Sequence, residues 1–452
     1  MKKFFILFCF ILIFLSACTS AKKIAEPTLP VNLRQSNELR LCLPGYQYLA
    51  NPYMRAVNVY KQKYPDVEVI LEIIGDPDEY PSDGSEYIKH IRNGIADGSG
   101  PDIILTTFLY DFYDLADDGA FLNLSHIMEN DEEFDIGDFN ENVINAGIYR
   151  GARYVMPLSY ETNILLTDKK ALERINFDLS RDTDFFSFFT EIVNCLPYAK
   201  DNPAFKRMFN EMLAGSLVNA AGLTIYDREN KNLLPLDDKT REFCEAYKPY
   251  YKTDIKEIYD FGYGFELIPA GDFYFEKHYG SQNIFYNYSR LKDLGFDPAF
   301  TAVRTMDGGL SARINDSLAI RYGAKNEANA WNFVKMMLSE TIQYARVGWG
   351  QGFWGDPVNN KAFSRQIDEI LRRGENIGFW SEERGGYQLF CPEIPDEEKA
   401  PYRELHEAVT NCTIGNAAIE SYFFHHMTPF FEDVKSYEEC INDFISAMDD
   451  FK

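Results

Sequence analysis

The sequence is poor in basic residues relative to acidic ones. It holds 45 Lys and Arg against 70 Asp and Glu, a formal net charge of −25 over 452 residues. Loss of residues 1–17, which contain Lys2 and Lys3, would leave 43 against 70, or −27. Such a chain repels nucleic acid and anionic lipid headgroups, and no basic cluster along it offsets that repulsion. We therefore expect no nucleic acid among its partners.

The residue spacings that mark common catalytic and metal sites are also missing. The eight cysteines include no C-x-x-C pair, and there are only six histidines. The sequence contains no G-x-S-x-G elbow, no H-E-x-x-H helix and no G-x-x-x-x-G-K-[ST] loop. We expect no cofactor, no metal and no chemical step. One or two disulfides, with Cys391 and Cys412 as the nearest pair, and buried free thiols remain alternative fates of the scattered cysteines.

The one long hydrophobic run lies at the N-terminus. Lys2 and Lys3 precede an apolar run of twelve residues, Phe4 to Leu15, which is the layout of a secretory signal. At about 1.5 Å per residue this run is too short to cross a hydrocarbon core of about 30 Å as a helix. The Leu-Ser-Ala-Cys ending at Cys18 resembles the lipobox of bacterial lipoproteins. The resemblance implies cleavage before Cys18 and a lipid on that cysteine, which would hold the protein at the extracytoplasmic face of the cell membrane. A plain signal peptide cleaved nearby is the alternative.

The rest of the chain has the composition of a folded protein. Apolar residues make up 46% and aromatic residues 15% of the sequence, enough for a packed interior. The length suits two or three domains. Residues 18–37 are mixed and polar, and we expect them to form a tether.

Regular structure is expected from Leu39 onward. Strand and helix patterns alternate with short breaks, which indicates an α/β fold with a parallel sheet. The expected strands are 39–43, 67–74 and 102–105, and the expected helices between and after them are 51–63, 85–95 and 111–118. A hairpin at 149–157 should lead into a strand, 163–167 should be extended, 184–259 mainly helical, and 267–275 and 300–303 strands. Asn326 should cap a helix whose stripe includes Trp331 as a core residue. The last helix is expected at 437–451.

The order of several short segments resembles a known family. The segments are 59–69 (VYKQKYPDVEV), 98–103 (GSGPDI), 118–124 (DGAFLNL) and 151–157 (GARYVMP), followed by 308–311, 326–343, 357–359 and 429–439. Together they are similar to the extracellular solute-binding proteins of ABC importers, of the carbohydrate type related to maltose-binding protein. The segments 274–304 and 375–398 depart from that pattern.

The resemblance implies a two-lobe, periplasmic-binding-protein-like α/β fold with hinge strands and a ligand cleft between the lobes. By this analogy the first lobe takes residues 38–158 and 308–365. The second takes 159–307 and 366–452.

Candidate ligand residues follow from the chemistry of sugars. Aromatic rings match the apolar face of a sugar, and carboxylates match its hydroxyls. We look for both at strand ends, at the predicted crossover and on the Gly-rich loop 348–355. Ordinary loop packing of the rings and solvation of the acids are the alternatives. The candidates are Tyr46, Tyr48, Phe108, Tyr110, Asp111, Tyr160, Glu161, Trp349, Trp354 and Trp380.

We therefore expect a monomeric, lipid-anchored substrate-binding protein that captures an extracellular solute and delivers it to ABC permease subunits. A mono- or oligosaccharide is the favoured ligand. A surface glycosidase or other polysaccharide-processing protein, and a binding protein for a non-sugar ligand such as a polyamine, remain alternatives.

Overall fold

A computed structural model describes most of the chain after the N-terminal segment. The described residues are 33–45, 47–75, 84–109, 112–181, 183–199, 214–227, 232–233, 238–251, 275–277, 280–293, 295–344, 353, 355–370, 375–379, 387–414 and 417–450. The predicted signal segment and Cys18 lie outside them. No helix of this part of the chain is long and apolar enough to cross a membrane.

The elements are numbered along the chain. The strands are β1 (Glu38–Pro44), β2 (Glu68–Ile74), β3 (Ile103–Leu105), β4 (Ile148–Tyr149), β5 (Ala152–Arg153), β6 (Met156–Thr162), β7 (Ile164–Asp168), β8 (Tyr226–Asp227), β9 (Asn232–Leu233), β10 (Phe275–Lys277), β11 (Pro298–Ala302), β12 (Leu310–Ile320), β13 (Asp356–Pro357), β14 (Glu375–Phe379), β15 (Tyr387–Cys391) and β16 (Val409–Thr413). The α-helices are α2 (Gln47–Lys63), α3 (Ser85–Asp97), α4 (Phe112–Asp117), α5 (Ser125–Glu129), α6 (Glu141–Asn145), α7 (Lys169–Arg174), α8 (Phe185–Ala199), α10 (Ala214–Ala220), α11 (Asp238–Tyr251), α12 (Ser281–Asp293), α13 (Glu327–Met337), α14 (Glu340–Gln343), α15 (Asn360–Glu369), α16 (Asp396–Glu407), α17 (Ala417–Phe431) and α18 (Tyr437–Asp450).

The first third of the chain forms three parallel strands of a seven-stranded sheet. β1 pairs in parallel with β2 on one side and with β3 on the other. Leu39, Leu41 and Leu43 of β1 are buried, as their alternation predicts. Gly98 ends α3 in the left-handed conformation, and its N–H donates to the carbonyl of Ile95. The predicted strand–helix–strand–helix–strand order is confirmed here.

The long strand β12 joins this sheet to the rest of the molecule. The strand order is β13-β6-β12-β3-β1-β2, and β16 also pairs with β12. β12 runs antiparallel to β3 at its C-terminal end, antiparallel to β6 in its middle and parallel to β16 at its N-terminal end. One strand therefore contacts elements that are far apart in the sequence.

A second, smaller sheet and a group of helices form the other half. β7 lies between β10 and β11, both antiparallel to it. The helices α7, α8, α10, α11, α17 and α18 enclose a separate core rich in phenylalanine, with Phe185, Phe243 and Phe423 fully buried. The mainly helical pattern predicted for 184–259 is confirmed in its described residues. Of the strand predicted at 267–275, only Phe275 is described, and it begins β10.

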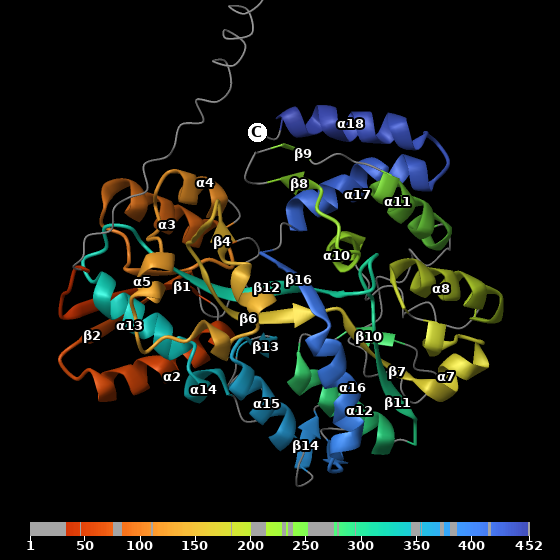
Figure 1. Ribbon diagram of the computed structural model, residues 1–452, viewed down its shortest axis with the longest axis horizontal. Helices are drawn as coiled ribbons and strands as arrows, with labels where there is room; N and C mark the ends of the chain where they lie inside the picture. The colour runs from red at the N-terminus through yellow and green to blue at the C-terminus, as the bar shows by residue number, and fades with distance from the viewer. Residues whose placement is uncertain are drawn as a thin grey trace, which may run out of the picture.

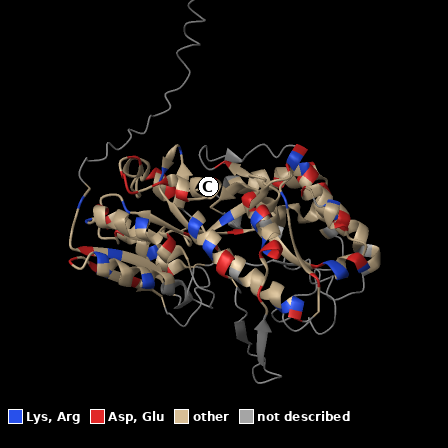
Figure 2. Cartoon of the chain, turned by 60° about the horizontal axis from the view of Figure 1, so that its bottom comes forward, with Lys and Arg blue, Asp and Glu red and all other residues tan. Residues whose placement is uncertain are grey.

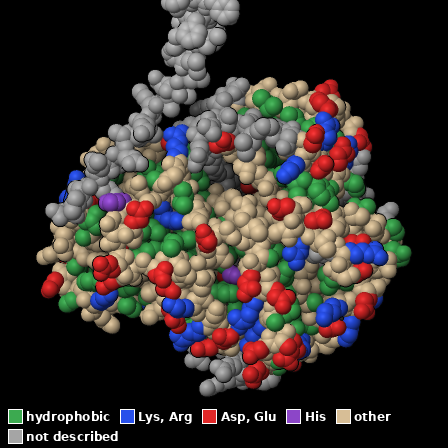
Figure 3. Space-filling model, viewed as in Figure 1, with side chains coloured by type: hydrophobic (Ala, Val, Ile, Leu, Met, Phe, Trp, Pro, Cys, Tyr) green, Lys and Arg blue, Asp and Glu red, His purple; other side chains and the backbone are tan. Residues whose placement is uncertain are grey.

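The two halves form the two lobes of the molecule. Figure 1 shows the β1–β2 side with α2, α3, α5 and α13 at the left, and α7, α8, α11, α17 and α18 at the right. Acidic and basic residues are interspersed over both lobes (Figures 2 and 3). The two-lobe α/β fold predicted from the sequence is confirmed.

The helix at Asn326 shows one difference from the prediction. Asn326 precedes α13, but its side chain makes no capping hydrogen bond. Its Nδ2 instead donates to the carbonyls of Ser36 and Glu38, both at 2.8 Å, and fixes the entry to β1. The predicted helix is correct, whereas the predicted cap is wrong because a tertiary partner takes the side chain.

Two further sequence predictions concern single side chains. Trp331 is a core residue as predicted, since it is 3% exposed and its Nε1 donates to Asp131 at 2.6 Å. Of the cysteines whose side chains the structure describes, five carry free thiols, and one of them, Cys412, belongs to the pair closest in sequence. The five are Cys42, Cys195, Cys244, Cys412 and Cys440.

Candidate functional site

Within the described residues, the chain passes between the two sheets at two adjacent places. β6 leads into β7 through Asn163 alone, and residues 303–309 connect β11 to β12. The side-chain Nδ2 of Asn163 donates to the carbonyl of Ser311 at 3.4 Å, and its own carbonyl accepts from Val303 N–H at 2.9 Å. These two passages are the candidate hinge, because a lobe movement must be absorbed where few backbone segments connect the lobes.

The strands at these passages have one polar and one apolar face. β6 and β12 pair so that Glu161 lies opposite Arg313, and Tyr160 lies opposite Ile314. Successive residues of a strand point to opposite faces, so Glu161 and Tyr160 face opposite sides. We use the term polar face for Thr106, Thr107, Ser159, Glu161, Arg313, Asp316 and Ser317.

A carboxylate and a guanidinium meet on the polar face. Arg313 donates from Nη2 to Glu161 Oε1 at 2.6 Å. The Glu161 side chain is 3% exposed and that of Arg313 is 39% exposed. Thr413 of β16 pairs with Arg313 on the other edge of β12, and its hydroxyl accepts from Asn219 Nδ2 of α10 at 2.8 Å. Three neighbouring strands, β6, β12 and β16, therefore present groups of different hydrogen-bonding character side by side.

Hydroxyl groups and a second carboxylate extend this face toward the end of β3. The Thr106 and Ser317 hydroxyls are 2.6 Å apart, and the Ser159 hydroxyl donates to Asp316 Oδ2 at 3.3 Å. Thr107, which is exposed, donates from its hydroxyl to the Asn315 carbonyl at 2.9 Å. The carboxyl ends of parallel strands are the usual place for ligands in α/β sheets. The polar face is therefore the best candidate site among the described residues.

The opposite face of β6 is closed by a buried polar network. The hydroxyl of Tyr160, which is fully buried, lies 2.5 Å from Nε2 of His406 on α16. Asp356 of β13 accepts from the Tyr402 hydroxyl at 2.8 Å and from Ser281 N–H at 2.9 Å. Burial raises the pKa of Tyr160 and of Tyr402 well above the usual range, so both remain donors. This network fixes β6 to β13, α12 and α16.

His406 within this network is neutral. Its ring stacks on Phe363 with centroids 3.7 Å apart, and its Nε2 lies 3.7 Å from Asp356 Oδ2. Burial lowers the pKa of His406 to about 4, and the attraction of Asp356 only partly opposes that shift.

A cavity of about 380 Å³ lies between the lobes. Its volume is in the range of small-molecule sites. Cys412, which pairs with Ala312 on the Tyr160 side of the strands, is part of its lining. The polar and aromatic side chains of the lining come from both lobes and include Tyr113, Asn145, Tyr149, Asn219, Tyr226 and Glu420.

The structure describes the side chains of three predicted ligand residues. Phe108 follows β3, is half-buried and packs close to Gly84 at the start of α3. Glu161 lies on the polar face. Tyr160 is enclosed in the core, so its ring does not face an open cleft in this structure. Tyr160 and Glu161 lie within β6, before the passage at Asn163 and not after the crossover as predicted, because β6 pairs with β12 through Thr162.

The remaining predicted residues cannot be placed by their side chains. Tyr48 lies in α2, but its side chain is outside the described residues. The others lie outside the described residues altogether; they are Cys18, Tyr46, Tyr110, Asp111, Trp349, Trp354 and Trp380.

Sequence reasoning missed Arg313 and Asp316. Both belong to β12, where polar and apolar residues alternate up to Ile314 and three polar residues then follow in a row. The pairing register shifts at this point, which is a β-bulge. The alternation of polar and apolar residues in this strand is interrupted, and the strand also contains an arginine. This pattern could have identified both residues from the sequence.

Comparison with known proteins identifies the family of this chain. The family model for bacterial extracellular solute-binding proteins matches residues 44–344. The chain belongs to the bacterial extracellular solute-binding proteins. Among curated proteins, no sequence matches this chain.

Solved structures of such solute-binding proteins share the fold at low sequence identity. The sugar-binding protein MalE of Xanthomonas citri has a TM-score of 0.65 at 12% identity, covering 91% of this chain and 96% of that one. A periplasmic oligogalacturonide-binding protein of Yersinia enterocolitica gives 0.61 at 16%, covering 92% and 98%. An ABC substrate-binding protein of Listeria monocytogenes, in complex with cycloalternan, gives 0.57 at 14%, also covering 92% and 98%.

Proposed function

We propose that this solute-binding protein captures an extracellular mono- or oligosaccharide and delivers it to the permease of an ABC importer. The main support for this proposal is the polar face at the lobe passages. It combines a carboxylate, a guanidinium and several hydroxyls on strands that connect both lobes. Sugar hydroxyls both donate and accept hydrogen bonds, so they are matched by mixed partners, and bonds to charged groups are the stronger ones.

The neighbours in structure support the same ligand class. One is described as a sugar-binding protein, one as an oligogalacturonide-binding protein, and one is in complex with cycloalternan. At identities of 12–16% they share the fold, and their ligands enter here only as the basis of a proposal.

Binding is proposed to act through lobe closure. A ligand on the polar face would contact the first lobe through β6 and β12 and the second lobe through elements beyond Asn163. A ligand that touches both lobes binds the closed state more tightly and so increases its population. The permease would distinguish the two states by the lobe surfaces.

The first test is a ligand screen on the protein from residue 19 onward. A ligand at about 100 times its dissociation constant should stabilise the fold by about 2.7 kcal/mol, which a thermal shift detects. We expect one sugar class to give that shift without product formation. Cleavage of a glycan would contradict the proposal and favour the surface glycosidase.

The variant Glu161→Gln tests the site itself. It keeps the side-chain shape but removes the charge, and we expect the sugar-induced shift to fall sharply. Glu340→Gln is the matched control, because Glu340 also pairs with an arginine, Arg365, at 3.3 Å, but on an exposed surface outside the polar face. Equal loss in both variants would refute the assignment of the site.

A cationic ligand is the second candidate. The polar face holds two carboxylates, Glu161 and Asp316, but Arg313 is its one cation, so a polyamine would find a net negative surface. A thermal shift with polyamines and none with sugars would select this candidate.

The location is part of the proposal. We infer that Cys18 carries a lipid that holds the protein at the outer face of the cytoplasmic membrane. Cells that express Cys18→Ser should release the protein or retain its precursor, and should fail to incorporate labelled fatty acid into it. Labelling that persists in Cys18→Ser would contradict this.

A further inference from the structure

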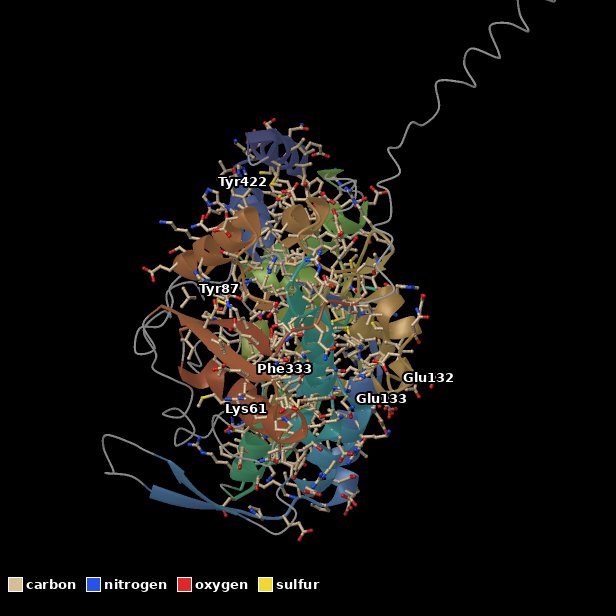
Figure 4. All side chains as sticks on the ribbon, turned by 90° about the vertical axis from the view of Figure 1, so that its left-hand side faces the viewer. Lys61, Tyr87, Glu132, Glu133, Phe333 and Tyr422 are labelled. Carbon is tan, nitrogen blue, oxygen red and sulfur yellow. The ribbon has the colours of Figure 1, made fainter. Side chains whose placement is uncertain are left out.

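Three potential metal ligands converge in the first lobe, away from the polar face. Cys42 of β1 and Glu72 of β2 are direct partners in the parallel pairing, so their side chains point to the same face of the sheet. α3 covers this face, since the Tyr87 hydroxyl donates to the carbonyl of Leu105 at 2.7 Å (Figure 4). His90 follows Tyr87 by one helical turn and therefore points the same way.

The distances between these groups are close to those of a metal site. Cys42 Sγ, a carboxylate oxygen of Glu72 and a ring nitrogen of His90 all lie within 4.8 Å of one another. His90 Nε2 and Glu72 Oε2 are 3.3 Å apart. Tetrahedral zinc with bonds of about 2.0–2.3 Å places its ligands about 3.3–3.8 Å apart, so small side-chain rotations complete the geometry.

Arg40 already orients the carboxylate. Its Nε donates to Glu72 Oε1, and its Nη1 donates to the carbonyl of Ser99 at 2.6 Å. The other oxygen of Glu72, Oε2, is the one that faces His90. Such a partner behind a ligand is typical of metal sites, where it fixes the ligand and tunes its basicity.

The site is accessible from one side. Cys42 is fully buried, whereas Glu72 is 14% and His90 39% exposed, so an ion would enter past the imidazole. Burial, together with the nearby Glu72 carboxylate, raises the pKa of the Cys42 thiol to about 12. The thiol is therefore protonated in the metal-free protein. On binding, the metal–sulfur bond replaces the S–H bond and the proton leaves to solvent.

We propose that Cys42, Glu72 and His90 bind a divalent transition-metal ion, with Zn²⁺ as the best match. Sulfur, imidazole and carboxylate form a mixed set that suits Zn²⁺ and not Mg²⁺ or Ca²⁺, which require oxygen ligands. Water would complete the tetrahedron. The ion would tie β1, β2 and α3 together, and sequence spacing does not reveal the site because each ligand comes from a different element.

The test uses tag-free protein from residue 19 onward, titrated with Zn²⁺ against a chromogenic chelator and separately with Co²⁺. We expect one tightly bound equivalent and a near-ultraviolet thiolate-to-cobalt charge-transfer band. Cys42→Ala should abolish the band and weaken Zn²⁺ binding by more than about 100-fold, beyond the 10–100-fold typical of changes behind the ligands. Arg40→Gln should weaken binding by about 10-fold.

Two further variants keep the test decisive. His90→Gln changes a partly exposed helix residue, so it should fold and still lose Zn²⁺ affinity. Cys195→Ala removes another buried thiol, in the second lobe, and should leave both the band and the affinity unchanged. Absence of a bound equivalent in the unmodified protein, or a band that survives Cys42→Ala, would overturn the proposal.

Discussion

Replacing Asp356 by alanine should destabilise the protein far more than the loss of an ordinary surface carboxylate. Asp356 is fully buried on β13 and accepts hydrogen bonds from the Tyr402 hydroxyl at 2.8 Å and from Ser281 N–H at 2.9 Å. Asp356→Ala leaves both donors buried without this acceptor. Each such donor costs about 1–3 kcal/mol, so we expect the free energy of unfolding to fall by about 2–6 kcal/mol.

The matched variants separate the lost hydrogen bonds from the lost charge. Asp356→Asn keeps one acceptor oxygen and should cost clearly less than Asp356→Ala. Asp368→Ala removes a carboxylate that is 59% exposed and paired with Arg403 at 2.6 Å. Exposed pairs contribute about 0–1 kcal/mol, which bounds the effect expected of that control.

Urea denaturation followed by circular dichroism measures these differences, through the midpoint at constant slope. The reasoning is refuted if Asp356→Ala costs no more than Asp368→Ala while the variant remains folded. That result would mean that Tyr402 and Ser281 find other acceptors at little cost. In that case the buried polar network around Asp356 would not be what holds β6 in place beside the lobe passage.

Three other perturbations have definite expected outcomes. The pKa of His406 is about 4 in the fold and 6.5 in the reference state, so on acidification the unfolded chain binds the proton first. This difference should lower the free energy of unfolding by about 3 kcal/mol as pH drops from 6.5 to 4. Urea midpoints measured against pH should show a smaller fall for His406→Gln. Arg313→Leu removes the charge-assisted hydrogen bond to the buried Glu161 carboxylate and should lower the free energy of unfolding by about 1–3 kcal/mol in urea titrations. An unchanged midpoint would argue against the pair. Gly355→Ala should lower the melting temperature much more than Gly98→Ala: both have positive φ, but a Cβ at Gly355 meets the backbone of β6, whereas at Gly98 nothing lies within 4 Å. Equal shifts in the two glycine variants would contradict this packing.

Much of the fold could be predicted because local patterns determine it. The alternation of Leu39, Leu41 and Leu43 and the Gly98 stop each reflect a few neighbouring residues. Asn326 shows the limit of that reasoning. A helix was correctly predicted after Asn326, but the Asn326 side chain does not cap it. That side chain bonds instead to Ser36 and Glu38, which lie almost 300 residues earlier in the chain.

The candidate site was predictable only in part. Glu161 could be predicted as the acidic residue near the passage. Its neighbour Tyr160 points into the core, however. Which of these two side chains points toward the site depends on how β6 pairs with β12. Arg313, the partner of Glu161, is 152 residues away, and the register between β6 and β12 shifts only beyond this pair, between Ile314 and Ser317. The interrupted polar–apolar alternation of β12 marks Arg313 as unusual, but no local signal in the sequence identifies Glu161 as its partner.

The course of β12 limits how this protein can be divided or recombined. This single strand pairs with β3 and β6 in the first lobe and with β16 next to the second, while Asn163 and residues 303–309 carry the chain back and forth. Neither lobe is thus a contiguous block of sequence. Recombination between relatives at a single point would therefore combine parts of both lobes. New ligand specificity in such a protein should arise by substitutions within the existing two-lobe fold and not by exchange of whole lobes.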